Sequence, residues 1–277
     1  MRMRVSITLL LSVVLASCAG GSAGAPALGY AVPSSGEVTY LVGDTLVIGL
    51  AALGQGVEIG ARSAATYQLH YERGADGVRV SATVEDLAAD VVLPGAEPIS
   101  MDEGAFVGDF VFELDRRGRA LSMSSPQANQ LGGQVFAAPV VAHALFPRLP
   151  GRPVATGDSW VDTVSYREEV EAGVTQVTSA LTYTVVGDSR ADGRDLVDLA
   201  FEGTAEVTQN LVLEGARINQ ASSLGVVGRL RWDARAGILY ESDMSMEGPG
   251  SVRVALLPGA ALPTAVRWRT LVRLQTR

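Results

Sequence analysis

Apolar and polar residues alternate along much of this chain, and this pattern restricts the fold more than any other feature of the sequence. In residues 78–85 the even positions are Val, Val, Ala and Val, and the odd positions are Arg, Ser, Thr and Glu. Side chains of a β-strand point alternately to opposite faces, so the pattern predicts a strand with one buried face. The same period recurs in residues 110–114, 196–208, 224–233 and 264–274. We therefore expect a mainly β fold of antiparallel strands over a core.

The last of these segments combines the alternation with charge. One side carries four large apolar residues and the other carries three arginines: Val266, Trp268, Val272 and Leu274, against Arg267, Arg269 and Arg273. We expect the apolar set to face the core, with Trp268 as an anchor, and the arginines to face solvent. The arginines either pair with acidic residues of a neighbouring strand or contact an anionic partner.

Two blocks of the sequence match without a gap. Residues 63–77 and 179–193 agree at seven of fifteen positions, including Tyr67 with Tyr183, and both end in Ala-Asp-Gly, a hairpin-turn sequence. Gly-Asp pairs precede the two blocks and Asp-to-Gly turns follow them, at similar offsets: Gly43-Asp44 and Gly157-Asp158, then Asp115–Gly118 and Asp233–Gly237. These three pairs of motifs follow one another in the same order in both halves of the chain. This order predicts duplication of a unit of about 115 residues, giving two related antiparallel β lobes over residues 37–150 and 151–277.

Residues 126–146 interrupt the alternation and predict one helical insert near the middle of the chain. Ser125 can cap a helix, Pro126 suits the first helical position, and Pro139 is expected to kink or end the helix. The segment runs into a Pro-rich connector, residues 146–153, where we place the boundary between the two repeats.

The composition excludes several classes of site. The chain of 277 residues has 22 basic side chains, all of them arginine, against 30 acidic ones, and a sequence pI near 4.9. Without lysine there is no Schiff-base or Walker-type chemistry, and an acidic chain is a poor nucleic-acid binder. A single cysteine, Cys18, excludes an internal disulfide or a Cys-rich metal site.

The N-terminus reads as a bacterial secretion signal over residues 1–17. Arg2 and Arg4 form the positive region, and the apolar stretch from Val5 to Leu15 is too short to cross a membrane as a mature helix, which takes about 20 residues. The next four residues, Leu15-Ala16-Ser17-Cys18, resemble the lipobox of bacterial lipoproteins. That resemblance implies cleavage before Cys18, lipidation of its thiol and acylation (a palmitate-type modification) of the new N-terminus.

The resemblance also implies an address in the bacterial cell envelope. Ala19 stands where an Asp would retain a lipoprotein in the inner membrane, so the outer membrane is favoured, facing the periplasm or the cell surface. Residues 18–36 are uncharged and rich in Gly, Ala, Ser and Pro, and we interpret them as the lipidated Cys and a flexible tether spanning about 25 Å on average.

The chain also resembles a group of uncharacterised all-β bacterial lipoproteins that share an FPxLP turn and a GDxW motif. Here these motifs are Phe146-Pro147-Arg148-Leu149-Pro150 and Gly157-Asp158-Ser159-Trp160. The resemblance implies a fold and an address but no known activity. From their own sequence context, we interpret Asp158 as a turn former and Trp160 as a core residue.

The remaining polar residues predict no catalytic residue, no metal site and no bound cofactor. His70 is expected on a strand face and His143 as a packed or partly exposed helix residue. Asp102-Glu103 and the cluster Glu168, Glu169 and Glu171 lack the pattern of a calcium loop, and adjacent carboxylates on a strand point to opposite faces. We expect both acidic clusters in solvated loops or at an edge.

The sequence favours two functions ahead of a third, a hydrolase that would rely on Asp and Glu alone as a glycosidase does. The first is a non-enzymatic envelope lipoprotein that binds a protein partner through its sheets. The second is a carrier or sensor of an apolar ligand such as lipid, with residues 126–146 as a lid over a pocket. An enclosed apolar cavity of several hundred Å³ beneath that segment would favour the carrier, and a solid core would favour the interaction protein.

Cys18 is expected to hold the protein to the membrane. Cys18→Ser removes the thiol that the lipid would modify, so the variant expressed in the native host should be unlipidated and soluble. Membrane fractionation with salt and carbonate washes measures this. Retention of the variant in the washed membranes would contradict the prediction.

Overall fold

The fold is mainly β, as the alternation predicts. The computed structural model describes residues 27–50, 57–92, 95, 97–128, 136–170, 173–213, 216–254 and 261–275. The secretion signal and Cys18 lie outside the described residues. Within them, no helix is both long enough and apolar enough to cross a membrane.

The first half of the chain contributes the strands β1 (Glu37–Leu50), β2 (Val57–Arg73), β3 (Gly77–Val92), β4 (Ile99–Asp102), β5 (Phe106–Val107), β6 (Phe110–Asp115), β7 (Ala120–Ser124) and β8 (Gln127–Ala128). The second half contributes β9 (Ser159–Val170), β10 (Gly173–Ala191), β11 (Arg194–Leu213), β12 (Ala216–Asp233), β13 (Ile238–Val254) and β14 (Leu262–Gln275). A 3-10 turn, η1 (Glu103–Ala105), and the helix α2 (Ala138–Leu145) complete the described elements.

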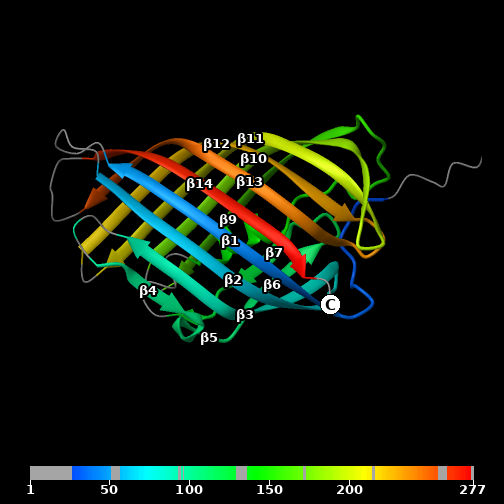
Figure 1. Cartoon of the computed structure of the whole chain (residues 1–277), viewed down its shortest axis with the longest axis horizontal. Helices are drawn as coiled ribbons and strands as arrows, with labels where there is room; N and C mark the ends of the chain where they lie inside the picture. Colours follow the sequence, from blue (N-terminus) through cyan, green and yellow to red (C-terminus); the bar gives the residue numbers. More distant parts are fainter. Residues whose placement is uncertain are drawn as a thin grey trace, which may run out of the picture.

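Twelve strands form one antiparallel sheet, seen in Figure 1 as a broad set of diagonal ribbons. The strand order is β7-β6-β3-β2-β1-β14-β13-β12-β11-β10-β9, with β4 paired to β3. Most neighbours in the sheet are also neighbours in sequence, as expected for hairpins. The exceptions are β3 with β6 and the central pair, β1 with β14, which runs from Thr39 opposite Gln275 to Leu50 opposite Thr264. This pairing makes one sheet out of the two halves of the chain.

The sheet curls until its two edges come close together. Strands β7 and β9 end the strand order and contact each other, and α2 contacts both of them as well as β10 and β14. The helix therefore lies on the concave side, over the seam between the edges. One glycine makes room for a core ring: a side chain on Gly228 would collide with the ring of Phe201, its partner on β11.

The core fills the concave face. Its largest fully buried side chains include Trp232, Tyr40, Phe110, Phe112 and Phe146. The predicted register of the last strand is confirmed for Val266, Val272 and Leu274, which are buried. Trp268 is on the same face but only half-buried.

The arginines of the last strand face solvent and pair with acidic residues, as the first of the two readings predicts. Arg269 lies 2.7 Å from Asp243, Arg273 lies 2.9 Å from Glu241, and Arg267 lies 3.5 Å from Glu58. Asp243 and Glu241 belong to the neighbouring strand β13. Exposed pairs of this kind contribute about 0–1 kcal/mol each to stability.

The predicted hairpin turns are confirmed. Asp192 and Gly193 both have positive φ, 48° and 73°, between β10 and β11, and Gly118 has a φ of 79° between β6 and β7. Tyr67 and Tyr183 are both buried, each on the strand that precedes an Ala-Asp-Gly turn.

Other parts of the predicted repeat differ in the structure. Asp44 lies in the middle of β1, whereas Asp158 lies in a turn before β9. The two halves also form one continuous sheet in place of separate lobes. The duplication itself stays a prediction.

The predicted helix is shorter and begins later than expected. Gln127 and Ala128 form β8, and α2 covers only Ala138–Leu145, with Pro139 in its first turn. The prediction that Pro139 ends or kinks a helix was wrong, because proline is equally compatible with a first turn, where the missing N–H is not needed.

The predicted tether also ends sooner than expected. Leu28 and Tyr30 are buried, and the Tyr30 hydroxyl donates a hydrogen bond to the carbonyl of Pro147. The Leu28 N–H donates to the carbonyl of Arg152, so residues 27–36 belong to the folded body. The apolar side chains of this segment outweigh its Gly- and Ser-rich composition.

One carboxylate ties the helix to both edges of the sheet. Glu168 of β9 accepts hydrogen bonds from the Ser125 N–H at 2.8 Å, the Ser125 hydroxyl at 2.7 Å and the Ala138 N–H at 3.1 Å. The Ala138 N–H also reaches the Ser125 oxygen at 2.9 Å. Because Ser125 follows β7 and Ala138 begins α2, we call these three residues the seam clamp. It also places a negative charge at the helix N-terminus, where the dipole favours it.

Loss of the seam clamp should destabilise the fold. We expect Glu168→Ala to lower the free energy of unfolding by about 1–3 kcal/mol, because it removes the acceptor of the partly buried Ser125 N–H and hydroxyl and one of the two acceptors of the Ala138 N–H. Urea titration measures the change. Glu169→Ala is the matched control, since Glu169 is exposed and pairs with Arg167, and its effect should stay within about 0.5 kcal/mol. Equal effects of the two substitutions would contradict the role of the clamp.

Candidate functional site

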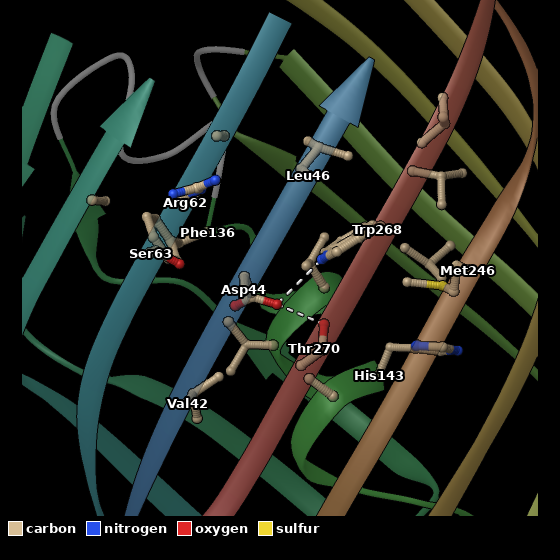
Figure 2. A pocket seen from close by; sticks show the side chains of 18 of the residues that line it. Val42, Asp44, Leu46, Arg62, Ser63, Phe136, His143, Met246, Trp268 and Thr270 are labelled. Atoms are coloured by element: carbon tan, nitrogen blue, oxygen red, sulfur yellow. Dashed lines mark hydrogen bonds between the residues drawn. The ribbon is translucent and has the colours of Figure 1, made fainter. Parts of the chain in front are cut away.

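Beside α2, the concave face of the sheet lines a cavity of about 290 Å³ that is partly open to solvent. Figure 2 shows its wall, with side chains of β1, β13 and β14 on one side and the helix behind them. The walls are mostly apolar because the alternation of apolar and polar residues, which builds the core, also holds in the parts of the strands that extend beyond α2. The apolar lining includes Val42, Leu46, Ile48, Ile59, Phe136, Val140, Val177, Val207, Met244, Met246, Val266 and Trp268.

An acidic side chain stands in this apolar wall. Asp44 Oδ1 accepts hydrogen bonds from Thr270 Oγ1 at 2.6 Å and from Trp268 Nε1 at 3.2 Å, both drawn in Figure 2. Burial raises the pKa of Asp44, and the two hydrogen bonds partly offset that rise. The group thus offers a hydrogen-bond acceptor in a mostly apolar wall, which also includes the charged side chains of Arg62 and Asp90.

The floor of the cavity carries a hydroxyl that is not used by the fold. Ser222 of β12 is buried, and its hydroxyl has no hydrogen-bond partner among the described residues. Its neighbour Leu224 continues the apolar floor. A small side chain at this position leaves space where a larger one would fill it.

The helix contributes a histidine. His143 lines the cavity, and its Nε2 is buried without a partner among the described residues. Burial lowers the pKa of His143 to about 4, so the imidazole is neutral at physiological pH. His143 is a packed residue of the helix, as expected, and its side chain forms part of the cavity wall.

A second, much smaller cavity of about 20 Å³ adjoins the first. His143, Ala144 and Met244 line both cavities. The remaining lining includes Arg148 of the connector and Ser179 of β10, with the rings of Tyr166 and Tyr183. Burial raises the pKa of Tyr166 to about 12, so this phenol stays neutral.

The other residues considered from sequence lie away from the cavities. His70 is exposed on the outer face of β2, near Glu37 and Glu72. Asp102 accepts a hydrogen bond from the Gly104 N–H in the turn η1, and Glu168 belongs to the seam clamp at the sheet edge. Glu171 lies outside the described residues.

The two residues singled out in the GDxW motif have structural roles. The Ala155 N–H and the Arg152 side chain donate to Asp158 in an exposed turn and hold the pKa of that carboxyl below its usual value. Trp160 is half-buried, stacks on Tyr183 with ring centroids 5.5 Å apart, and donates to the carbonyl of Arg148 at 3.2 Å. Within the described ranges no three His, Cys, Asp or Glu side chains gather as a metal site would require.

Sequence reasoning missed the polar residues of the cavities, although the signal was present. Asp44 falls on the apolar side of an alternating strand, between Val42 and Leu46. Ser179 stands likewise between Val177 and Leu181. A polar residue in the apolar register of a strand is costly to bury without a partner, so such positions indicate either a buried network or a site. Arg148 was noted only as part of a motif.

Comparison of the sequence with known proteins gives no match. No protein-family model matches the chain. No curated protein matches it either.

Several solved structures are similar at low levels. A structure reporting lipid–protein interactions in lipovitellin matches with a TM-score of 0.42 and 12% identity over 87% of this chain, which spans 25% of the lipovitellin chain. The β domain of the Bordetella autotransporter BrkA gives 0.30 and 9%, covering 87% of this chain and 100% of that one. Pseudomonas aeruginosa OccK9 gives 0.22 and 9%, covering 87% and 99%. At these TM-scores the likenesses carry no conclusion about function.

The buried histidine should make stability depend on pH. With a pKa of about 4 when folded and about 6.5 when unfolded, His143 binds its proton more readily in the unfolded chain. The free energy of unfolding should therefore fall as pH drops from 6.5 toward 4, by about 2 kcal/mol at pH 5.

Two variants separate this contribution from the rest of the molecule. His143→Leu should reduce the loss of stability between pH 7 and pH 5, measured by urea unfolding, by about 2 kcal/mol. His70→Gln, which changes the other histidine of the chain on the exposed outer face, should retain the loss. A His143→Leu protein with the wild-type pH dependence would show that this imidazole is not the group responsible.

Proposed function

We propose that this protein is a non-enzymatic lipoprotein of the bacterial cell envelope that carries or senses an apolar ligand in the cavity beside α2. The cavity of about 290 Å³ is the observation that supports this function over that of a protein-interaction module. It is about twice the ~150 Å³ of an apolar cavity that takes up benzene. Its lining of aliphatic and aromatic side chains, with a few polar groups, is the usual composition of a small-molecule site.

The lipid anchor on Cys18 is part of the same proposal. Cys18 precedes the first described residue, Ala27, by nine positions, a reach of about 30 Å at most for an extended chain. Residues 27–36 pack near the turn at Gly118 and the connector at Pro147. The anchor would thus hold this end of the sheet toward the membrane. The cavity would extend toward the other end of the sheet, because two of its lining residues, Ile48 and Val91, lie near the opposite ends of their strands.

Filling the cavity should abolish ligand binding without loss of the fold. Ser222→Phe places a ring in the cavity and sacrifices no hydrogen bond, since the hydroxyl has no partner among the described residues. Native mass spectrometry of the protein purified from its host should show a co-purified apolar molecule on the wild type and none on Ser222→Phe. Ser223→Phe is the matched control because Ser223 lies on the outer face of the same strand, and it should retain the molecule.

The outcomes distinguish the two functions. A wild-type protein that carries no apolar molecule, and that binds none from a panel of added lipids, would favour the interaction module. Equal loss of the molecule from both variants would show that the binding is not in this cavity. Circular dichroism melting of both variants checks that the fold is intact.

A further inference from the structure

A buried cation lies beside the cavity with part of its hydrogen-bonding capacity unused. Arg148 is 7% exposed, and its Nε and Nη1 groups have no hydrogen-bond partner among the described residues. Its Nη2 lies 3.5 Å from Asp162 Oδ1. Burying a guanidinium with unpaired N–H groups costs several kcal/mol, so the arrangement is unfavourable for the protein alone.

The counter-charge of Arg148 is shared. Asp162 Oδ2 also lies 3.0 Å from Nη2 of Arg117, at a shorter distance than the one to Arg148. One carboxylate thus faces two guanidinium groups, and its shorter contact is with Arg117. The Asp115 carboxylate nearby accepts hydrogen bonds from the backbone N–H groups of Arg117 and Arg119 in its own turn. The feature that favours an anion here is therefore the pair of Arg148 groups, Nε and Nη1, that have no partner among the described residues.

Other unpartnered polar groups line the same small cavity. The hydroxyl of Ser179, 2% exposed, and Nε2 of His143 have no hydrogen-bond partner within the described part of the chain. Arg148, Ser179 and His143 come from the connector, from β10 and from α2, so three separate elements converge on one space. A hydroxyl, a guanidinium and a neutral imidazole can all donate to an oxygen.

The size and the position of the small cavity restrict what can fill it. About 20 Å³ is little more than the ~10–15 Å³ that one water needs, which suits a carboxylate and excludes a substituted phosphate. His143, Ala144 and Met244 line both cavities, so a group in the small one can be continuous with a chain in the large one. By the same measure the large cavity, about 290 Å³, has room for roughly twenty water-sized groups.

We propose that the small cavity is a carboxylate subsite and that the carried ligand is a medium-chain fatty acid, with its head group on Arg148, Ser179 and His143 and its tail in the large cavity. This inference rests on the function proposed above. The orientation follows from the hydrogen-bonding groups of Arg148, Ser179 and His143 without partners among the described residues, which lie at the small cavity, whereas most of the lining of the large cavity is apolar.

Displacement of a neutral fluorescent probe tests the subsite. Nile red is first bound to the full chain carrying Cys18→Ser, and dodecanoic acid or 1-dodecanol is then titrated in at pH 7.5. In the chain that carries Cys18→Ser as its single substitution, the acid should displace the probe at a concentration about tenfold lower than the alcohol. This is the preference expected of one charge-assisted hydrogen bond. Arg148→Gln should remove this preference and leave displacement by the alcohol unchanged.

Two controls keep the test decisive. Arg152→Gln, in the same connector but on an exposed side chain that pairs with Asp158, should retain the preference for the acid. Ser179→Ala removes a hydroxyl with no partner among the described residues and should reduce the preference severalfold, which provides a second test if Arg148→Gln does not fold.

The outcomes separate the two proposals. If neither compound displaces Nile red, or Nile red does not bind, the apolar-ligand function fails together with the subsite. If acid and alcohol displace it equally from the Cys18→Ser chain, the cavity binds apolar ligands while the small cavity holds water only, and the carboxylate inference is overturned. Preference for the acid that survives both Arg148→Gln and Ser179→Ala overturns it as well.

Discussion

A wide sheet with one apolar face must bury that face, and in this molecule the sheet does so by curling onto itself. The pairing of β1 with β14 joins the two halves into a single sheet, and the approach of β7 to β9 nearly closes it. The short helix α2 then covers the remaining seam from inside, fixed by the carboxylate of Glu168. A helix of eight residues cannot fill the space enclosed by strands of up to twenty residues, so a cavity remains next to it.

The strands could be predicted from sequence because a period of two is a local property. The register of the last strand, with Val266 and Val272 inside and its arginines outside, needed no knowledge of the partner strands. The start of α2 could not be predicted in the same way, because the acceptors for its first N–H, Ser125 and Glu168, lie thirteen residues before it and thirty residues after it. The packing of Leu28 and Tyr30 likewise depends on contacts with distant turns.

The candidate site was only partly visible in the sequence. Asp44 and Ser179 could have been recognised as polar residues in an apolar register, since the strand pattern alone identifies them. Arg148 could not, because it lies in an irregular connector where no periodicity says which side chains are buried. His143 illustrates the limit of residue type as evidence: burial in the cavity wall lowers its pKa to about 4, and only the packing reveals that. Where polar groups converge from separate elements, the spacing along the chain carries no information about the site.

The pairing of β1 with β14 also sets the order in which the chain can reach its final form. Thr39 lies opposite Gln275, so the central pair of the sheet joins residues more than two hundred positions apart. Contacts of this separation form slowly, because the intervening chain must first be brought into a loop. Until β14 arrives, the apolar faces of β1 and β13 border an open gap in the middle of the sheet. During synthesis or export, the first half of the protein therefore has an unpaired strand edge at β1. The risk of aggregation through this edge lasts until the last strand, β14, has been made or exported and has paired with it.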